Sequence, residues 1–360
     1  MKKKFRMGII GCGGISGSHI RGIMDSPDLE IGALCDILPE RLEEKKLLCG
    51  AADDMCYSDY IRLLDSGKID AVSICTPNYL HYEMAMQAVK RGLPYAVEKP
   101  ACNTADEAAE LLEASTKNGV KNMVCFSYRF VAAARYARDL LQSGALGKVY
   151  HISGEYFQAW GLPNPKTGAL TPRVWRFDKE QAISGALGDL ACHMIDLMRF
   201  ITGREFTRLA ADHDTFIHRR PTPGADTESD VTVDDYINIA GQMRESAGAE
   251  PIAANLSISR FAYGRGNYQR IEIYGDNGAL RYTMENGAGL EINIGNEPMK
   301  QAHIWCAVPT PHHYNSSQMQ SFADILNGCG DGLAADMHDG WQTQRVLDAA
   351  AAAGANAREL

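Results

Sequence analysis

The glycine-rich segment "GIIGCGGIS" has the residue types and spacing that point most directly to a bound ligand. It follows an apolar run typical of a buried strand and opens a helical stretch, with Gly11, Gly13 and Ser16 at the three small-residue positions of the dinucleotide-binding fingerprint. Gly11 allows a tight turn, Gly13 lets a pyrophosphate approach the backbone, and Ser16 permits close helix–strand packing. Because a helix N-terminus offers unpaired N–H groups to phosphates, Gly14 and Ile15 belong to the same candidate site. The alternative is a glycine turn that binds nothing.

An acidic residue stands where such a site needs one. Asp36 ends the second apolar run, 20 residues after Ser16, in a position to accept hydrogen bonds from ribose hydroxyls. No arginine or lysine stands directly beside it, and a carboxylate would repel a 2′-phosphate, so NAD is favoured over NADP. Arg41 is close enough in sequence to flank the adenine; the alternative is an ordinary surface arginine of a helix.

The segment "YAVEKPACNT" places two charged residues, Glu98 and Lys99, at the end of an apolar run, and Pro100 ends that strand. In open parallel sheets, ligands bind outside the carboxyl ends of the strands. A lysine there can donate a hydrogen bond to a reacting oxygen and stabilise developing alkoxide charge. The alternative for a single lysine is a solvated charge at a strand end.

Strands and helices alternate over the first third of the chain, and this pattern must position the residues above. Apolar runs such as "KFRMGII", "KIDAVSICT" and "GLPYAVEK" are separated by helical stretches of moderate length. Such alternation predicts right-handed βαβ units and a parallel sheet covered on both faces. We therefore expect an α/β Rossmann domain over residues 1–126.

The pattern changes after residue 126. Alternating runs such as "KVYHISGEYFQAW", "VDDYINIAGQM" and "IAANLSISRFAY" follow with few helices between them, and "GDNGAL" is a hairpin signal. We expect residues 127–360 to form an α+β domain, an open and mostly antiparallel sheet with helices on one face and further helices near the C-terminus. The uncovered face predicts self-association, as a homotetramer.

Composition excludes several other classes of protein. The chain has 360 residues, a formal net charge of -9 and ten cysteines, which stand singly without a CxxC pair or a His–Cys metal spacing. The negative charge argues against nucleic acid or an anionic membrane as the partner. No apolar run is long enough to cross a bilayer. We therefore expect a cytoplasmic protein that holds no metal.

The motifs together carry a resemblance. With "CTPNYLHYE" after the fourth strand, "VEKP" after the next and "GALGDLACHMID" in the second domain, the chain resembles the Gfo/Idh/MocA oxidoreductase family over nearly its whole length. The resemblance implies an NAD-dependent dehydrogenase, with the nicotinamide at a cleft between the Rossmann domain and a sheet domain for substrate binding and oligomerisation. The local likeness is to members that oxidise the C3 hydroxyl of a pyranoside ring to a ketone, so the implied substrate is a sugar or glycoside.

The resemblance also assigns catalytic roles. Lys99 would lie near the nicotinamide and the reacting carbinol, and Asp189 with His193 would form a dyad; residues four apart share one face of a helix. A histidine, with a reference pKa of about 6.5, can take a hydroxyl proton near neutral pH. Asp189 would orient it or hold a second hydroxyl, and the immediate base is either Lys99 or His193. Taken singly, Asp189 could be a helix N-cap and His193 a structural histidine.

Further contacts follow from the same resemblance. Those expected for the cofactor, beyond the glycine loop and Lys99, are Thr76, Pro77, Asn78, His81 and Glu98. The candidate substrate contacts combine polar planar groups with aromatic faces, which suit the hydroxyl edges and the C–H face of a sugar ring: Tyr128, Arg129, Gln158, Trp160, Trp175 and Arg176. The alternative for His81 and for either tryptophan is a purely structural position.

Three other functions are compatible with the same residues. An inositol dehydrogenase would use the same three catalytic groups. A glycosidase with tightly bound NAD would oxidise C3 transiently and release the glycosidic group without net redox change. A sugar sensor would keep the fold without catalysis, but a sensor has no need of Lys99, Asp189 and His193 together.

Overall fold

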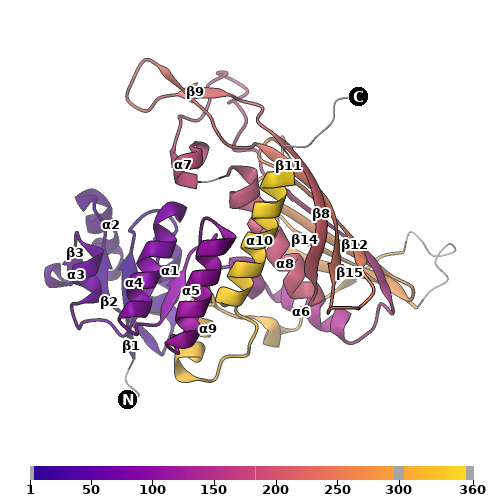
Figure 1. Cartoon of the computed structure of the whole chain (residues 1–360), viewed down its shortest axis with the longest axis horizontal. Coiled ribbons are helices and arrows are strands. Elements are labelled where there is room, and N and C mark those ends of the chain that lie inside the picture. Colours follow the sequence, from indigo (N-terminus) through magenta and orange to yellow (C-terminus); the bar gives the residue numbers. More distant parts are fainter. Residues whose placement is uncertain (1–3, 183, 296–303, 354–360) are drawn as a thin grey trace. The chain divides into compact units, whose positions relative to one another are not determined.

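The computed structural model describes residues 4–182, 184–295 and 304–353, which form two compact units (Figure 1). The first unit comprises residues up to 127 together with 316–344, and the second comprises 128–315 with the end of the chain. The segment 316–344, which the sequence pattern assigned to the second domain, therefore groups with the first unit. Its helix α9 (Gln318–Asn327) packs Met319 closely against Gly22, and the Ser26 hydroxyl donates a hydrogen bond to Gln320 Oε1 at 2.6 Å.

The first unit contains the predicted Rossmann sheet. Its parallel strands lie in the order β3-β2-β1-β4-β5-β6, which is typical of dinucleotide-binding folds. The strands are β1 (Phe5–Ile10), β2 (Leu29–Cys35), β3 (Cys56–Tyr57), β4 (Ala71–Ile74), β5 (Tyr95–Val97) and β6 (Asn122–Val124). Strands β4 and β5 are buried along their whole length, as expected for a sheet covered on both faces.

Helices surround this sheet (Figure 1). They are α1 (Ser16–Asp25), α2 (Pro39–Cys49), α3 (Tyr60–Leu64), α4 (His81–Lys90), α5 (Ala105–Lys117), α9, and the first part of α10 (Met337–Ala353). Local signals set their ends: Pro39 occupies the first turn of α2, Gly50 ends it in the left-handed conformation, and the Thr104 side chain caps α5 by accepting the Glu107 N–H.

The second unit is built on an eight-stranded sheet in the order β16-β15-β14-β13-β7-β12-β11-β8. All neighbouring pairs are antiparallel except β7 and β12, so the predicted open, mostly antiparallel sheet is confirmed. The strands are β7 (Val149–Phe157), β8 (Glu205–Asp214), β11 (Tyr236–Arg244), β12 (Ile252–Ser259), β13 (Tyr268–Gly275), β14 (Gly278–Met284), β15 (Ala288–Ile294) and β16 (Cys306–Val308). Strands β15 and β16 were not predicted from the sequence, nor was the small hairpin of β9 (Arg219–Pro221) with β10 (Glu228–Asp230), because these segments are short or weakly apolar.

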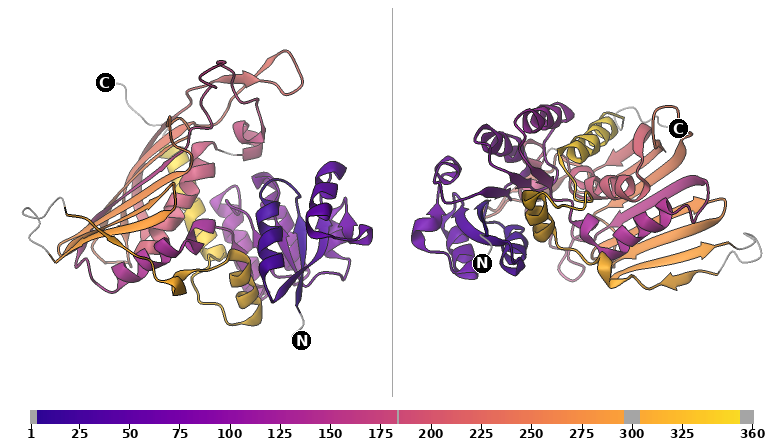
Figure 2. Two further views of the ribbon diagram at one scale, coloured as in Figure 1. Left: turned by 180° about the vertical axis from the view of Figure 1, so that it is seen from behind. Right: turned by 90° about the horizontal axis from the view of Figure 1, so that it is seen from below.

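Helices α6 (Ala132–Gln142) and α8 (Cys192–Thr202) pack on one face of this sheet (Figure 2). Gly154 of β7 makes the close approach possible, since a Cβ there would lie 3.0 Å from the sulfur of Met198. The short helical segments are η3 (Ser127–Phe130), η4 (Trp175–Phe177), α7 (Lys179–Ala182), η5 (Leu187–Ala191) and η6 (His312–Tyr314), and η1 (Asp53–Met55) and η2 (Asn78–Leu80) belong to the first unit. Over the described ranges, no helix has the length and apolar character to cross a membrane.

The opposite face of the sheet carries small and polar side chains around a shallow groove, among them Ser153, Ala210, Asn238, Ala240, Asn255 and Ser257. We expect this face to mediate self-association, and Ala240→Arg in this groove should shift the protein toward smaller species, because the added charges would oppose association. Sedimentation velocity of both proteins checks this. A wild-type protein that sediments as a monomer at all concentrations would rule it out.

Candidate active site

The turn after β1 brings the chain to the point where the strand order reverses. Gly11 has a φ of +90°, and a Cβ at this residue would lie 2.8 Å from the main-chain carbon of Cys75, which follows β4. Its N–H donates to the Cys35 carbonyl at 2.8 Å, at the end of β2. Both the positive φ and the lack of space therefore exclude a side chain at position 11, as the fingerprint predicted.

The next two glycines present open backbone. A Cβ on Gly13 or Gly14 would meet no heavy atom within 4 Å, and Ile15 beside them is 45% exposed. The Ser16 hydroxyl donates to the Gly13 carbonyl at 2.7 Å and so fixes the loop onto the first turn of α1. This open backbone at a helix N-terminus fits the pyrophosphate of a dinucleotide.

Asp36 lies at the end of β2 and is held by two backbone donors. Its Oδ2 accepts the Cys12 N–H at 2.6 Å, and its Oδ1 accepts the Leu38 N–H at 2.9 Å. Each carboxylate oxygen keeps a further lone pair, so the oriented group can still receive two ribose hydroxyls. Arg41 is exposed in the first turn of α2.

Replacing Asp36 with Asn should weaken NADH binding by about 10-fold to 100-fold, because a hydrogen bond to a charged group contributes about 1.5–3 kcal/mol. The same change should narrow the preference over NADPH, since the repulsion of the 2′-phosphate disappears. Fluorescence titration with both dinucleotides measures both effects, with Asp25→Asn at the exposed end of α1 as the matched control. Equal affinity of the wild type for NADH and NADPH would contradict the assignment.

The ends of β4 and β5 carry the other expected cofactor residues. Thr76 and Pro77 are partly exposed, whereas Asn78 is buried at the start of η2. The His81 ring is fully buried, with Nδ1 2.7 Å from the Pro100 carbonyl oxygen and Nε2 2.8 Å from that of Thr76. His81 therefore connects the loop after β4 with the segment after Lys99 through backbone contacts.

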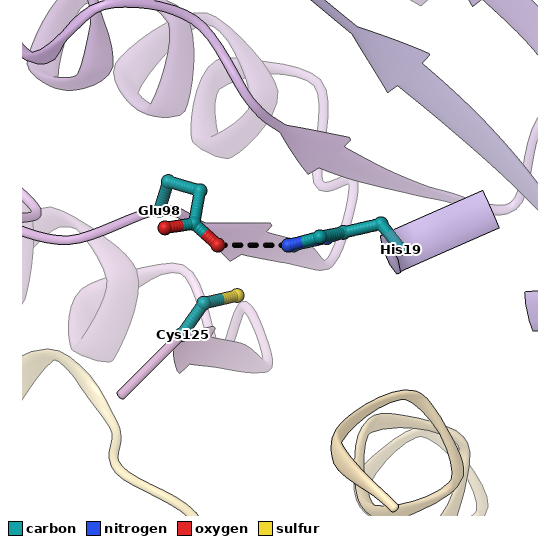
Figure 3. Close-up of side chains that lie close together, drawn as sticks. All are labelled: His19, Glu98 and Cys125. Atoms are coloured by element: carbon teal, nitrogen blue, oxygen red, sulfur yellow. Dashed lines mark hydrogen bonds and ion pairs between the residues drawn. The ribbon is translucent and has the colours of Figure 1, made fainter. Parts of the chain in front are cut away.

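Lys99 follows β5 and is partly exposed, while its neighbour Glu98 is buried. The carboxylate of Glu98 points into the unit and lies 2.8 Å from Nε2 of His19 (Figure 3). Its other oxygen accepts the Lys99 main-chain N–H at 3.3 Å. The inward direction of this side chain, and its partner on α1, were not predicted from the sequence.

In the second unit, Asp189 and His193 lie on one continuous helical segment. Asp189 belongs to η5, a π-helical turn that leads directly into α8, on which His193 lies. The Asp189 N–H donates to the Gly185 carbonyl at 2.9 Å, and Asp189 is partly exposed. The sequence predicted a regular α-helix through both residues. At Asp189 the structure instead has a wider π turn, which is a feature frequent at functional sites.

An aromatic and amide cluster lies beside the imidazole of His193. The ring of Tyr128 meets it edge-on at 4.7 Å between centroids, and the Tyr128 hydroxyl lies 2.8 Å from that of Tyr156. Tyr156 donates to Asn267 Oδ1 at 2.5 Å, and Gln158 Nε2 donates to the same oxygen at 2.9 Å. The structure thus brings together Tyr128 and Gln158, both predicted, with two residues that were not.

Of the two residues that were not predicted, Tyr156 and Asn267, only one has a signal in the sequence. Tyr156 occupies an inward position of the predicted alternating strand, so the pattern could have identified it. Asn267 lies just before β13 in "YGRGNYQ", where local sequence carries no such signal. Burial raises the pKa of the Tyr156 phenol far above its ordinary value, and the neighbouring Tyr128 and the charge of Asp189 act in the same direction. The phenol is therefore a neutral hydrogen-bonding group at any working pH.

The remaining predicted substrate residues have structural partners. Arg129 is buried and pairs with Asp196 of α8, with its Nη2 2.6 Å from Oδ1. Trp160 packs against Phe177 at 5.4 Å between ring centroids. The guanidinium of Arg176 lies 4.4 Å from the ring centroid of Trp175. These contacts connect Arg129 to the helix of His193 and leave both tryptophans in local packing.

Known proteins share this sequence and fold. A profile for the oxidoreductase family with an NAD-binding Rossmann fold matches residues 5–126, and one for the GFO/IDH/MocA C-terminal domain matches residues 134–281. A levoglucosan dehydrogenase of Pseudarthrobacter phenanthrenivorans is 30% identical over 295 residues, 78% of this chain and 73% of that protein. A D-glucoside 3-dehydrogenase of Escherichia coli is 29% identical over 200 residues, 55% of this chain and 54% of the relative. A solved levoglucosan dehydrogenase in complex with NADH and levoglucosan superposes with a TM-score of 0.85 at 27% identity, covering 98% of each chain.

Proposed function

The chain belongs to the GFO/IDH/MocA family of NAD-binding oxidoreductases, which act on sugars or cyclitols, and from this premise we propose that it oxidises the C3 hydroxyl of a pyranoside to a ketone. The observation that carries the proposal is the cluster beside His193. Tyr128, Tyr156, Gln158 and Asn267 combine aromatic faces with hydroxyl and amide groups, which together match the C–H face and hydroxyl edges of a sugar ring. Relatives named for levoglucosan and for position 3 of a glucoside support the same substrate class.

In this proposal each catalytic group has a separate task. NAD, when held by the glycine turn and Asp36, would supply the acceptor for the hydride of the carbinol carbon. Lys99 donates a hydrogen bond to the reacting oxygen and stabilises its growing negative charge. His193 takes the hydroxyl proton as the general base, and Asp189 accepts a hydrogen bond from a neighbouring hydroxyl of the substrate. The hydroxyl thus loses a proton and the carbon a hydride, which leaves the carbonyl.

The remaining cofactor residues hold and shape the site. The turn of Gly11, Gly13, Gly14, Ile15 and Ser16 would bind the pyrophosphate, and Asp36 the adenosine ribose. His81 would position the loop after β4, since both of its ring nitrogens meet backbone carbonyls. Arg129 would position α8 by its ion pair with Asp196, a role that differs from the direct substrate contact expected from sequence.

The test is a substrate panel. Purified protein with NAD is mixed with hexoses, anhydrosugars, glycosides and inositols, while absorbance of the reduced nicotinamide and release of free glycosidic groups are both recorded. Reduction with pyranosides, and a 3-keto product identified by NMR, would support the proposal. A response to inositols alone would make the protein a cyclitol dehydrogenase. Released glycosidic groups without net reduction would indicate a glycosidase, and no product of either kind a sensor.

A further inference from the structure

Three side chains from different elements lie close together near the carboxyl end of β5. His19 comes from the second turn of α1, Glu98 follows β5, and Cys125 follows β6 (Figure 3). All three residues are buried, and their nitrogen, oxygen and sulfur atoms lie within 4.8 Å of one another. The His19–Glu98 contact is direct at 2.8 Å, a hydrogen-bond distance, so this pair is satisfied within the protein.

His19 uses both nitrogens of its ring. Nε2 meets the Glu98 carboxylate, and Nδ1 lies 2.7 Å from the hydroxyl oxygen of Ser73 on β4. A carboxylate can only accept, so Nε2 carries a proton; a hydroxyl can accept or donate, so the contact at Nδ1 suits either a protonated or an unprotonated nitrogen. Burial lowers the pKa of His19, but Cys75 and Glu98 raise it more, to about 10. The ring is therefore a buried cation at neutral pH.

Glu98 is the matching anion. Burial raises the pKa of its carboxyl, but the hydrogen bond and charge of His19, with the charges of Lys99 and His81, bring the net pKa below its ordinary value. Its second oxygen accepts the main-chain N–H of Lys99. A continuous chain of contacts thus runs from the helix of the phosphate loop, through His19 and Glu98, to the backbone of the lysine.

Other titratable groups also face the pair. Burial raises the pKa of the Cys125 thiol well above its ordinary value, so the thiol stays protonated. Burial lowers the pKa of His81, whereas the carbonyls of Pro100 and Thr76 and the charge of Glu98 raise it. The sulfur of Cys75 also faces the His19 ring. Among these groups, His19 makes the direct 2.8 Å contact with the Glu98 carboxylate.

We propose that His19 is a positioning residue for Lys99, which through Glu98 fixes the lysine main chain and balances the carboxylate charge beside the ammonium group. The inference rests on the proposed function only where it gives Lys99 a part in the reaction. The pair itself ties the cofactor-binding helix to the lysine by charge-assisted hydrogen bonds, which are stronger than neutral ones. His19 thereby couples the placement of the dinucleotide to the placement of the reacting lysine.

The test measures the charge of Lys99 without substrate turnover. The full chain is treated with an amine-acylating reagent at a series of pH values, and mass spectrometry of the Lys99 peptide gives the midpoint of its modification. His19→Gln keeps a hydrogen-bonding side chain but removes the cation. We expect the Lys99 midpoint to rise by up to about one pH unit, because the carboxylate then acts on the ammonium group without the His19 cation, which in the wild type is present below about pH 10.

A double variant separates charge balance from packing. In His19→Gln/Glu98→Gln both charges are gone, so the midpoint should return close to that of the wild type. An unchanged midpoint in His19→Gln, or a double variant shifted as far as the single one, would overturn the proposal. If His19→Gln does not fold, Glu98→Gln alone tests the proposal. Its Lys99 midpoint should be lower than that of the wild type, because the lysine loses its neighbouring anion. An unchanged or raised midpoint in Glu98→Gln would overturn the proposal too.

Two further comparisons complete the design. His338→Gln changes an exposed histidine of α10 in the same unit and should leave the Lys99 midpoint unchanged. The modification needs no sugar, so its outcome does not depend on whether the substrate panel succeeds. If no sugar is oxidised but the Lys99 midpoint shifts, the proposed function is rejected and the role of His19 is kept. If sugars are oxidised but the midpoint does not shift, the proposed function is kept and the role of His19 is rejected.

Discussion

Replacing Lys99 with Ala should lower kcat for sugar oxidation by about 1000-fold, in the range found when a single charge-stabilising donor is removed from an active site. The lysine is the group of this chain proposed to place a positive charge beside the reacting oxygen, and alanine removes that charge. The chain around it should be little disturbed, because the Lys99 N–H bond to Glu98 involves the backbone and survives the change. Steady-state rates with the substrate from the panel measure the loss.

Binding measurements separate this effect from loss of the cofactor site. NADH affinity of Lys99→Ala should stay within about threefold of the wild type, since the glycine turn and Asp36 remain intact. Lys90→Ala, at the exposed end of α4, is the matched control and should keep full activity. A Lys99→Ala enzyme with more than a tenth of the wild-type kcat would show that the lysine does not stabilise the transition state.

The fold of both units was accessible from the sequence because it depends on local periodicity. Short apolar runs separated by helices specify a parallel sheet, and alternating runs specify an antiparallel one. The glycine turn and Asp36 were accessible for a similar reason, since a phosphate loop is a contiguous motif whose conformation and chemistry come from the same residues. Cys12 N–H on Asp36, at 2.6 Å, shows how closely that motif and the acidic residue are joined.

What the sequence did not predict depends on contacts between distant segments. Helix α9 returns to the first unit through Met319 and Gln320, and nothing in its own amphipathic pattern identifies the partner helix. Asn267 reaches Tyr156 from a loop more than a hundred residues away in sequence. The Glu98 side chain points inward because it has a buried partner there, and that partner is His19. In each case the deciding partner is remote in sequence, so residue type and local spacing leave the side chain's role open.

Replacing His193 with Asn should lower kcat by about 100-fold to 10,000-fold, the usual contribution of a general base, because an amide keeps a hydrogen-bonding group but cannot take the proton. Asparagine is smaller than imidazole, so the edge contact with Tyr128 is also lost, at a cost of about 0.5–1.5 kcal/mol in stability. Tyr128→Phe is the matched control: it keeps the ring and removes the hydroxyl bond to Tyr156, so KM should change more than kcat.

The pH profile of this variant identifies the base. A general base must be unprotonated, so kcat/KM for oxidation falls as the pH decreases through the pKa of that group. If His193 takes the proton, its replacement removes this acid limb and leaves a low, pH-independent rate on that side. If Lys99 takes the proton, the limb persists in His193→Asn with its midpoint unchanged, because the titrating group is still present. We expect the limb to disappear, since Lys99 acts best as a charged donor to the oxygen, and a lysine that serves as donor cannot at the same time be the unprotonated base.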